Sequence, residues 1–243
     1  MAYGLARSEA EAVELISDDR VTVNGAPVLN AARQVTERDQ LSVLAVERFV
    51  SRGGLKLEHA LEHFEQVGQP VRIRDARVLD AGASTGGFVD CLLQRGASVV
   101  VACDVGRGLL HPKIAGDPRV EVRDGLNARD IGRAVQDGVI RGEFDLVVAD
   151  LSFISLRAVM ASLLAAVRSK GELLLLVKPQ FEASKQEVDR GGGVISDPAV
   201  RQRCIDEVAS SVTQHGAVID GDVESGVPGP AGNREHWLRA VKG

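Results

Sequence analysis

The sequence predicts an α/β protein in which a doubly wound sheet is preceded by a small α+β domain. Short apolar runs at 77–81, 144–150 and 172–178 alternate with segments of helical period, which is the order of βαβ units. A glycine-rich turn directly follows the first of these runs. A separate hairpin signal stands near the start of the chain. Together these observations indicate one parallel sheet with an appended unit.

The beginning of the chain predicts a helix followed by a hairpin. A capping box opens a short helix that ends at Asp18. Alternation around Asn24-Gly25 is a strong hairpin signal, and 40–46 has the pattern of a third strand. We expect this unit to span 1–46, and a unit of about fifty residues buries too little surface to be very stable alone.

A linker at 47–54, which contains two glycines and has no clear period, separates this unit from a main domain at 55–243. The first helix of the main domain has one apolar face and should dock on the sheet. The apolar runs are of the type that buried parallel strands show. In chain order we expect helices near 57–64, 88–95, 127–139, 156–167 and 198–215, and further strands at 98–103, 119–123, 217–223 and 236–242.

The stretch from Arg77 to Phe88 has the order of strand, tight turn and helix start, where a doubly wound sheet binds a nucleotide-like ligand. A dinucleotide fingerprint needs a central glycine, but Ser84 stands there, and no Lys-Ser/Thr pair follows as in a phosphate loop. A cationic nucleoside without phosphate, such as S-adenosylmethionine, fits better, because Asp80 can attract its amino and sulfonium groups. The candidate cofactor-binding residues of this turn are Asp80, Gly82, Ala83, Ser84, Gly86 and Gly87.

A second acid supports a nucleoside site. Asp104 ends the next predicted strand, 24 residues after Asp80. An acid about 20 residues beyond such a turn binds ribose hydroxyls in nucleotide sites. Asp124 or Asn127, after the following strand, is a candidate to face the adenine.

Charged residues end two inner strands of the predicted sheet. Asp150 and Lys178 each follow an apolar run, and the ligand crevice of an open α/β sheet lies outside the carboxyl ends of its strands. Glu235, after a turn-rich stretch, can reach the same edge. A simple ion pair between Asp150 and Lys178 is the alternative interpretation. The sequence has no Ser-His-Asp order, no Cys nucleophile with a paired base and no His cluster, so it predicts neither nucleophilic hydrolysis nor a metal site.

Composition limits the class of protein. With 44% hydrophobic residues the 243-residue chain can bury a sizeable core, and a net charge of −5 argues against a general nucleic-acid coat. The three cysteines show no metal spacing and fit buried thiols in a reducing cytosol. No segment approaches the roughly 18 apolar residues of a membrane helix, and no signal peptide is visible. We therefore expect a cytoplasmic protein without membrane contact.

Two stretches of the first unit resemble a known RNA-binding module. Leu5-Ala-Arg-Ser8 and Asp19-Arg-Val-Thr-Val-Asn-Gly25 are similar to the S-four-type domain of a small-subunit ribosomal protein and of pseudouridine synthases. The family has a helix ahead of this point, where only residues 1–4 stand, so we expect a shortened first helix. Charge is balanced over 1–56, with seven Lys or Arg against eight Asp or Glu. The candidate RNA-binding residues are Arg7, Arg20, Arg48 and Arg52.

Several stretches of the main domain are together similar to the TlyA family, also called hemolysin A. They are 51–57, 80–88, 149–154, 176–182 and 229–235. The resemblance implies a Rossmann-like methyltransferase of the FtsJ type that binds S-adenosylmethionine. It further implies methylation of the ribose 2′-hydroxyl of cytidine in ribosomal RNA, in some species on both subunits and in others on the large one.

The same resemblance implies a catalytic set of two lysines and two acids, at Lys56, Asp150, Lys178 and Glu235. Lys178 is the candidate that acts on the 2′-hydroxyl, as a base or as an orienting charge, and both roles stay open. Lys56 would be its neighbouring cation, and the two carboxylates would fix the lysines. The chain departs from the family in the linker, where Glu47 and Phe49 stand in place of an arginine and a tryptophan.

Two other functions compete with this one. The family's older name suggests a membrane-active hemolysin, although the chain offers neither a spanning segment nor a basic balance. A non-catalytic assembly factor would bind RNA without transferring methyl groups. The sequence leaves open the target nucleotide, the ribosomal subunit, and whether the protein is a monomer or a weak homodimer.

Overall fold

The computed structural model describes residues 5–6, 8–17, 21–28, 30, 32–36, 38–43 and 48–243, in two compact units, Met1–Arg48 and Phe49–Gly243. The division falls within the linker expected at 47–54. Helix α2 (Arg52–Gln66) begins inside that segment, so the last three residues of the expected linker, 52–54, are helical and do not form a loop. Gly54 permits close packing at this point, because a Cβ there would press into the ring of Phe49.

The first unit consists of α1 (Glu9–Ser17), β1 (Val21–Val23), β2 (Ala26–Pro27) and β3 (Leu41–Val43). The strands pair antiparallel in the order β2-β1-β3. Asn24 and Gly25 have φ values of 53° and 80°, which close the tight turn between β1 and β2 and confirm the expected hairpin. The expected third strand is present, and its last residues, 44–46, lie outside the described residues.

The second unit is built on a seven-stranded sheet. Its strands are β4 (Arg77–Ala81), β5 (Val99–Asp104), β6 (Val120–Asp124), β7 (Phe144–Ala149), β8 (Val167–Val177), β9 (Ala217–Glu224) and β10 (His236–Lys242). In the order β6-β5-β4-β7-β8-β10-β9, the first five are parallel and β10 runs antiparallel to both neighbours. The strand order reverses between β4 and β7, which is the switch point of the sheet. The predicted doubly wound α/β sheet is confirmed.

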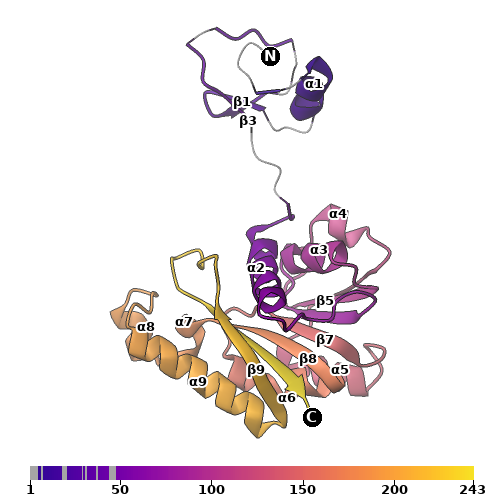
Figure 1. The fold of residues 1–243 in the computed structure, drawn as a ribbon, viewed down its shortest axis with the longest axis vertical. Coiled ribbons are helices and arrows are strands. Elements are labelled where there is room, and N and C mark those ends of the chain that lie inside the picture. Colours follow the sequence, from indigo (N-terminus) through magenta and orange to yellow (C-terminus); the bar gives the residue numbers. More distant parts are fainter. Residues whose placement is uncertain are drawn as a thin grey trace. The chain divides into compact units, whose positions relative to one another are not determined.

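Helices cover both faces of this sheet (Figure 1). On one face α2 packs with α3 (Gly87–Gln94) and α4 (Pro112–Ala115). On the other face lie α5 (Ile131–Gln136), α6 (Met160–Ala166) and α9 (Pro198–Gln214). The inner strands β4, β5 and β7 are therefore buried from both sides, and close packing holds their carboxyl ends in place.

Two expected helices are shorter than the sequence pattern suggests. Residues 127–139 form a 3-10 turn (Ala128–Asp130) and then α5, which ends before Gly138 because this glycine adopts a left-handed φ of 73°. Residues 156–167 begin as a second 3-10 turn (Leu156–Ala158) ahead of α6. Two short helices, α7 (Pro179–Glu182) and α8 (Lys185–Arg190), follow β8.

Candidate functional site

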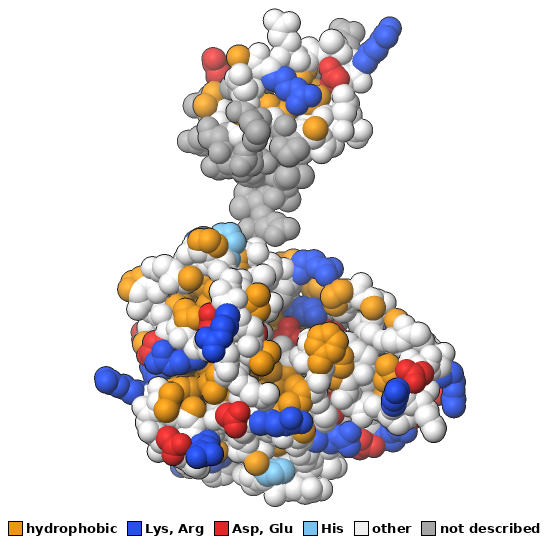
Figure 2. All heavy atoms as spheres, turned by 180° about the vertical axis from the view of Figure 1, so that it is seen from behind, with side chains coloured by type: hydrophobic (Ala, Val, Ile, Leu, Met, Phe, Trp, Pro, Cys, Tyr) orange, Lys and Arg blue, Asp and Glu red, His pale blue; other side chains and the backbone are white. Residues whose placement is uncertain are grey.

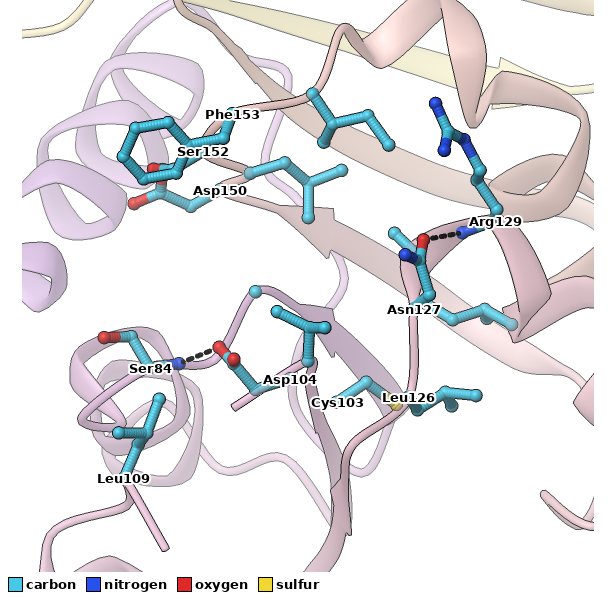
Figure 3. A pocket seen from close by; sticks show the side chains of 16 residues that line it. Ser84, Cys103, Asp104, Leu109, Leu126, Asn127, Arg129, Asp150, Ser152 and Phe153 are labelled. Atoms are coloured by element: carbon cyan, nitrogen blue, oxygen red, sulfur yellow. Dashed lines mark hydrogen bonds between the residues drawn. The ribbon is translucent and has the colours of Figure 1, made fainter. Parts of the chain in front are cut away.

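A cavity of about 570 Å³ opens at the carboxyl ends of β4, β5 and β7, beside the switch point of the sheet. Cavities of about 300–1,000 Å³ are usual for small ligands. Ser84, Asp104 and Leu109 lie across this cavity from Asp150 and Phe153 (Figure 3). The position is that of the ligand crevice in open α/β sheets.

The turn after β4 brings bare backbone to the cavity wall. Gly82 has a φ of 89°, and a Cβ on it would collide with the carbonyl oxygen of Asp150. Ser84 also has a positive φ, 47°, and its amide donates a hydrogen bond of 2.8 Å to Oδ2 of Asp104. Gly86, with a φ of 93°, precedes α3 as its N-cap. A ligand can therefore approach the main chain closely at this turn.

Asp104, at the end of β5, joins the two loops of this wall. Its Oδ1 accepts a hydrogen bond of 2.7 Å from the amide of Gly106, and its Oδ2 accepts the one from Ser84 (Figure 3). A carboxylate oxygen can accept more than one hydrogen bond. The carboxylate of Asp104 can therefore also bind hydroxyl groups of a ligand in the cavity.

The wall beyond Asp104 is apolar. Val105 and Leu109 are exposed side chains that line the cavity together with Leu126 and Ile154. Exposed apolar surface inside a concave site gains free energy when a ligand removes it from water. A flat ring such as adenine suits this part of the cavity.

The structure separates the two residues that were expected to face the adenine. Asn127 lines the cavity, although its Oδ1 also accepts a hydrogen bond of 3.0 Å from the amide of Arg129 and so caps the first 3-10 turn. Asp124 accepts a hydrogen bond of 2.8 Å from the amide of Gly108 and does not line the cavity. Asn127 is therefore the better placed of the two.

Asp80 lies behind the glycine turn and is fully buried. Neither of its carboxylate oxygens has a hydrogen-bond partner among the described residues. Burial, and to a smaller extent the charges of Asp150 and Asp104, raises the pKa of Asp80 well above its ordinary range. Asp80 does not line the cavity, but a buried carboxyl without a partner favours a cationic group nearby.

We expect Asp80→Asn to stabilise the ligand-free protein increasingly as the pH rises. The carboxyl of Asp80 binds its proton more tightly in the folded wild type than in the unfolded chain, where its pKa is about 4. Its free energy of unfolding therefore falls as the pH rises from about 4 toward the raised pKa. The side-chain amide that Asp80→Asn introduces does not titrate, so this variant lacks the pH-dependent fall in the free energy of unfolding.

Melting curves at about pH 5 and about pH 8 test this, since each kcal/mol shifts the melting temperature by about 2–4 °C in a chain of this size. The gap between Asp80→Asn and the wild type should widen toward the higher pH. Asp189→Asn, at an exposed aspartate, is the control. A gap that stays constant would contradict the expected titration of Asp80.

A second cavity, of about 280 Å³, adjoins the first, and both are lined by Gly82, Ser84, Asp150 and Ser152. The start of α2 forms its opposite wall, where a Cβ on Gly87 would collide with Ser51. Lys56 and Lys178 both line this cavity. The two cavities therefore meet along Asp150 and Ser152.

Each of the two lysines is paired with its own carboxylate. Nζ of Lys56 lies 2.5 Å from Oε2 of Glu235, and Nζ of Lys178 lies 2.5 Å from Oδ1 of Asp150. Lys178 also donates a hydrogen bond of 3.1 Å to the hydroxyl of Ser152. Lys56, Lys178 and Glu235 are 7%, 9% and 1% exposed, so the loss of one partner would leave a buried charge, at about 3–5 kcal/mol.

The structure thus brings together the two lysines and two acids that the sequence comparison singled out. Lys56, Asp150 and Lys178 line the second cavity, and Glu235 is buried behind it as the ion-pair partner of Lys56. Figure 2 shows a hollow in the second unit with charged side chains of both signs at its base and hydrophobic side chains around it.

Ser152 lines both cavities and Phe153 lines the first, but neither was singled out from the sequence. Phe153 has a left-handed φ of 63°, is 92% exposed, and its ring lies 5.3 Å from that of Phe181. Exposed aromatic rings beside a site are surfaces on which nucleobases stack. Both Ser152 and Phe153 belong to the stretch 149–154 that resembles the family, and this was the signal in the sequence that could have identified them.

The four arginines proposed for RNA contact have different outcomes. Arg7 and Arg20 lie outside the described residues. Arg48 is exposed and belongs to the first unit. Arg52 begins α2 and lines the second cavity.

Other kinds of site find no support in the described part of the chain. None of its helices combines the length and apolar character that a membrane crossing requires. Nor do three or more His, Cys, Asp or Glu side chains gather there as a metal site would need. The three cysteines are free and buried, and burial raises the pKa of Cys103, at the cavity wall, to about 12. This thiol therefore stays protonated near neutral pH.

Two known families match the chain. The FtsJ-like methyltransferase family matches residues 49–241, and the S4 domain matches residues 1–41. The 16S/23S rRNA (cytidine-2′-O)-methyltransferase TlyA of Mycobacterium tuberculosis is 43% identical over 240 residues, which cover 97% of this chain and 86% of that protein. Hemolysin A of Brachyspira hyodysenteriae is 33% identical over 238 residues, which cover 98% of this chain and 95% of that protein.

Solved structures have the same fold. A candidate hemolysin from Lactococcus lactis is 41% identical, with a TM-score of 0.74 over 81% of this chain and 90% of that chain. Fibrillarin of Aeropyrum pernix, with natively bound S-adenosyl-L-methionine, is 15% identical, with a TM-score of 0.54 over 91% of this chain and 88% of that chain, a likeness of fold alone. Family, relatives and fold agree with the motifs quoted above. The chain belongs to the FtsJ-like methyltransferase family.

Proposed function

We propose that this protein transfers a methyl group from S-adenosylmethionine to the ribose 2′-hydroxyl of cytidine in ribosomal RNA. The observation that carries the proposal is the boundary between the two cavities, where Lys178 is held by Asp150 and Ser152. This boundary separates a cavity that suits a nucleoside from a cavity that is lined by two lysines. The relative from M. tuberculosis is named for the same reaction, which supports the substrate class.

The first cavity fits S-adenosylmethionine. Asp104 would accept its ribose hydroxyls, the apolar wall with Leu109 and Asn127 would hold its adenine, and the bare backbone at Gly82 would allow close approach. Asp80 lies behind this wall and does not line the cavity, and a cationic group bound nearby would favour the charged form of its carboxyl. When bound, this cofactor supplies an electrophilic methyl group on a sulfonium.

The second cavity would hold the acceptor nucleotide. Lys56 and Lys178 line it as hydrogen-bond donors, and Arg52, at its edge, can contact a phosphate of the RNA. Phe153 lines the adjoining first cavity, and its exposed ring can stack on the base and thereby orient the attached ribose.

Lys178 would act on the 2′-hydroxyl, because an unactivated hydroxyl is a poor nucleophile. Lys178 forms an ion pair with Asp150 and donates one hydrogen bond to Ser152, so its ammonium keeps an N–H group that can donate to the hydroxyl oxygen. In this state the lysine orients the hydroxyl, and as a neutral amine it would accept the hydroxyl's proton. Glu235 holds Lys56 at the same cavity. Alignment of donor and acceptor would supply much of the acceleration.

The first unit would bind the RNA. We take 1–46 as the RNA-binding domain and 47–51 as the connection, since α2 already begins at Arg52 and opens the catalytic domain. The S4 match over residues 1–41 supports this assignment. A ribosomal substrate also implies that the protein acts in the cytoplasm.

Transfer of a radiolabelled methyl group to purified ribosomal subunits tests the proposed function. We expect incorporation that requires the protein, and loss of a cytidine 2′-O-methyl group in ribosomes from cells that lack it. RNA binding in a gel shift without incorporation would instead support an assembly factor. Lysis of liposomes without cofactor would support a hemolysin.

A further inference from the structure

Glu182 is a buried acid outside the lysine and acid pairs described above. It ends α7, four residues beyond Lys178, and is 5% exposed. Its carboxylate accepts hydrogen bonds from the hydroxyl of Ser155 at 2.5 Å and the amide of Leu156 at 2.7 Å. Nε of Arg157 donates a further bond of 3.2 Å. All three donors lie directly after the loop 150–154, which lines both cavities.

These contacts connect two segments that the sheet alone does not hold together. Strands β7 and β8 are paired in parallel as far as Ala149 and Leu175. Beyond that point Asp150 and Ser152 stand in a loop, while Lys178 stands at the start of α7. The carboxylate of Glu182 spans the gap between these two segments.

The loop needs such support because its backbone is strained. Phe153 has a left-handed φ of 63°, a conformation that persists only where the surroundings determine it. On one side of Phe153, the amide of Asp150 donates a hydrogen bond of 3.1 Å to the carbonyl oxygen of Ala81. On the other side, the bonds to Glu182 hold Ser155 and Leu156. The loop is thus held at both ends.

We propose that Glu182 is a positioning residue for methyl transfer, which holds the loop 150–154 so that Asp150 and Ser152 both reach the ammonium of Lys178. The proposal rests on the proposed function. Glu182 itself lines neither cavity and acts through the loop. Ser155 and Leu156 are the contacts through which it acts.

Glu182→Gln tests the proposal, because the amide keeps an acceptor oxygen but its NH₂ group cannot accept from Ser155 or Arg157. We expect kcat for methyl transfer to fall about 10- to 100-fold, because a small misplacement of the reacting groups lowers the rate by a factor of this size. The Kd for S-adenosylmethionine should rise by a smaller factor than kcat falls, because Asp104 and the glycine turn, across the cavity from this loop, still line the cofactor site. Glu182→Asp, which retains the charge, should recover part of kcat.

Glu172→Gln is the matched control. Glu172 is also a buried glutamate, and it accepts hydrogen bonds of 3.0 Å and 2.9 Å from Arg239 on β10, away from both cavities. We expect this variant to melt at a lower temperature but to keep the wild-type kcat. If both variants lose kcat only in proportion to the folded protein that they lose, Glu182 is structural and the proposal is wrong.

Amide hydrogen exchange gives a measure that does not depend on activity. Glu182→Gln should speed exchange over residues 151–157 by at least about tenfold, and Glu172→Gln should not. Unchanged exchange in Glu182→Gln would refute the proposal even if the wild type methylates RNA. Faster exchange with a wild type that transfers no methyl group would retain the loop anchor and refute the proposed function alone.

Discussion

Replacement of Lys178 with alanine is expected to abolish methyl transfer while the Kd for S-adenosylmethionine stays within about threefold. The rate of methyl transfer should fall by about 10²- to 10⁴-fold, which is the usual contribution of a positioned proton-transfer group. Lys178 lines the second cavity and not the first, so its removal takes no side chain out of the cofactor wall. Radiolabelled transfer to ribosomal RNA and calorimetric titration of the cofactor measure the two quantities.

Lys170→Ala is the control for this variant, because Lys170 is an exposed lysine on β8, the strand that directly precedes Lys178. It should keep wild-type turnover. Near-normal turnover of Lys178→Ala would remove Lys178 from the mechanism.

Lys178→Arg separates the two roles that remain open for this residue. A guanidinium stays charged and can orient a hydroxyl, but it cannot take up its proton. Partial activity in Lys178→Arg would indicate an orienting charge. Activity as low as that of Lys178→Ala would indicate a base.

Gly82→Val is expected to abolish binding of S-adenosylmethionine. A β-branched residue is a genuine outlier at the φ of 89° that Gly82 adopts. Its Cβ would also collide with the carbonyl oxygen of Asp150 and lie 3.2 Å from the side chain of Leu151, so the turn must move out of the cavity wall. Calorimetric titration should show no binding at cofactor concentrations that saturate the wild type.

Gly138→Val is the matched control for Gly82→Val. Gly138 has a φ of 73°, and a Cβ there would meet no atom within 4 Å. It therefore carries a similar backbone strain, of about 1–2 kcal/mol, without the collision and away from the cavities. Gly138→Val should melt at a lower temperature and bind the cofactor normally. Unchanged affinity in Gly82→Val would refute the assignment of this turn to the cofactor.

The sheet and its glycine turn were predictable because their signals are local. Runs of apolar residues mark strands buried on both faces, and Gly82 and Gly86 stand where only a positive φ closes the turn. The hairpin at Asn24-Gly25 is of the same kind, since two adjacent residues carry its geometry. Helix ends were predicted less well. The helical pattern of hydrophobic residues continues to 139, but α5 ends at Gln136 because Gly138 adopts a left-handed φ.

The sequence by itself determined the order of the elements, the doubly wound sheet and the turn at its switch point, since neighbouring residues carry these signals. Only the tertiary structure decided which distant residues meet. Lys56 and Glu235 are 179 positions apart and form one ion pair, and Asn127 lines the cavity where Asp124 does not. Glu182 ends the stretch 176–182 that resembles the family, but only its contacts showed that it holds Ser155 and Leu156. Such pairings depend on how helices and loops pack on the whole sheet, and no local pattern of residues records that packing.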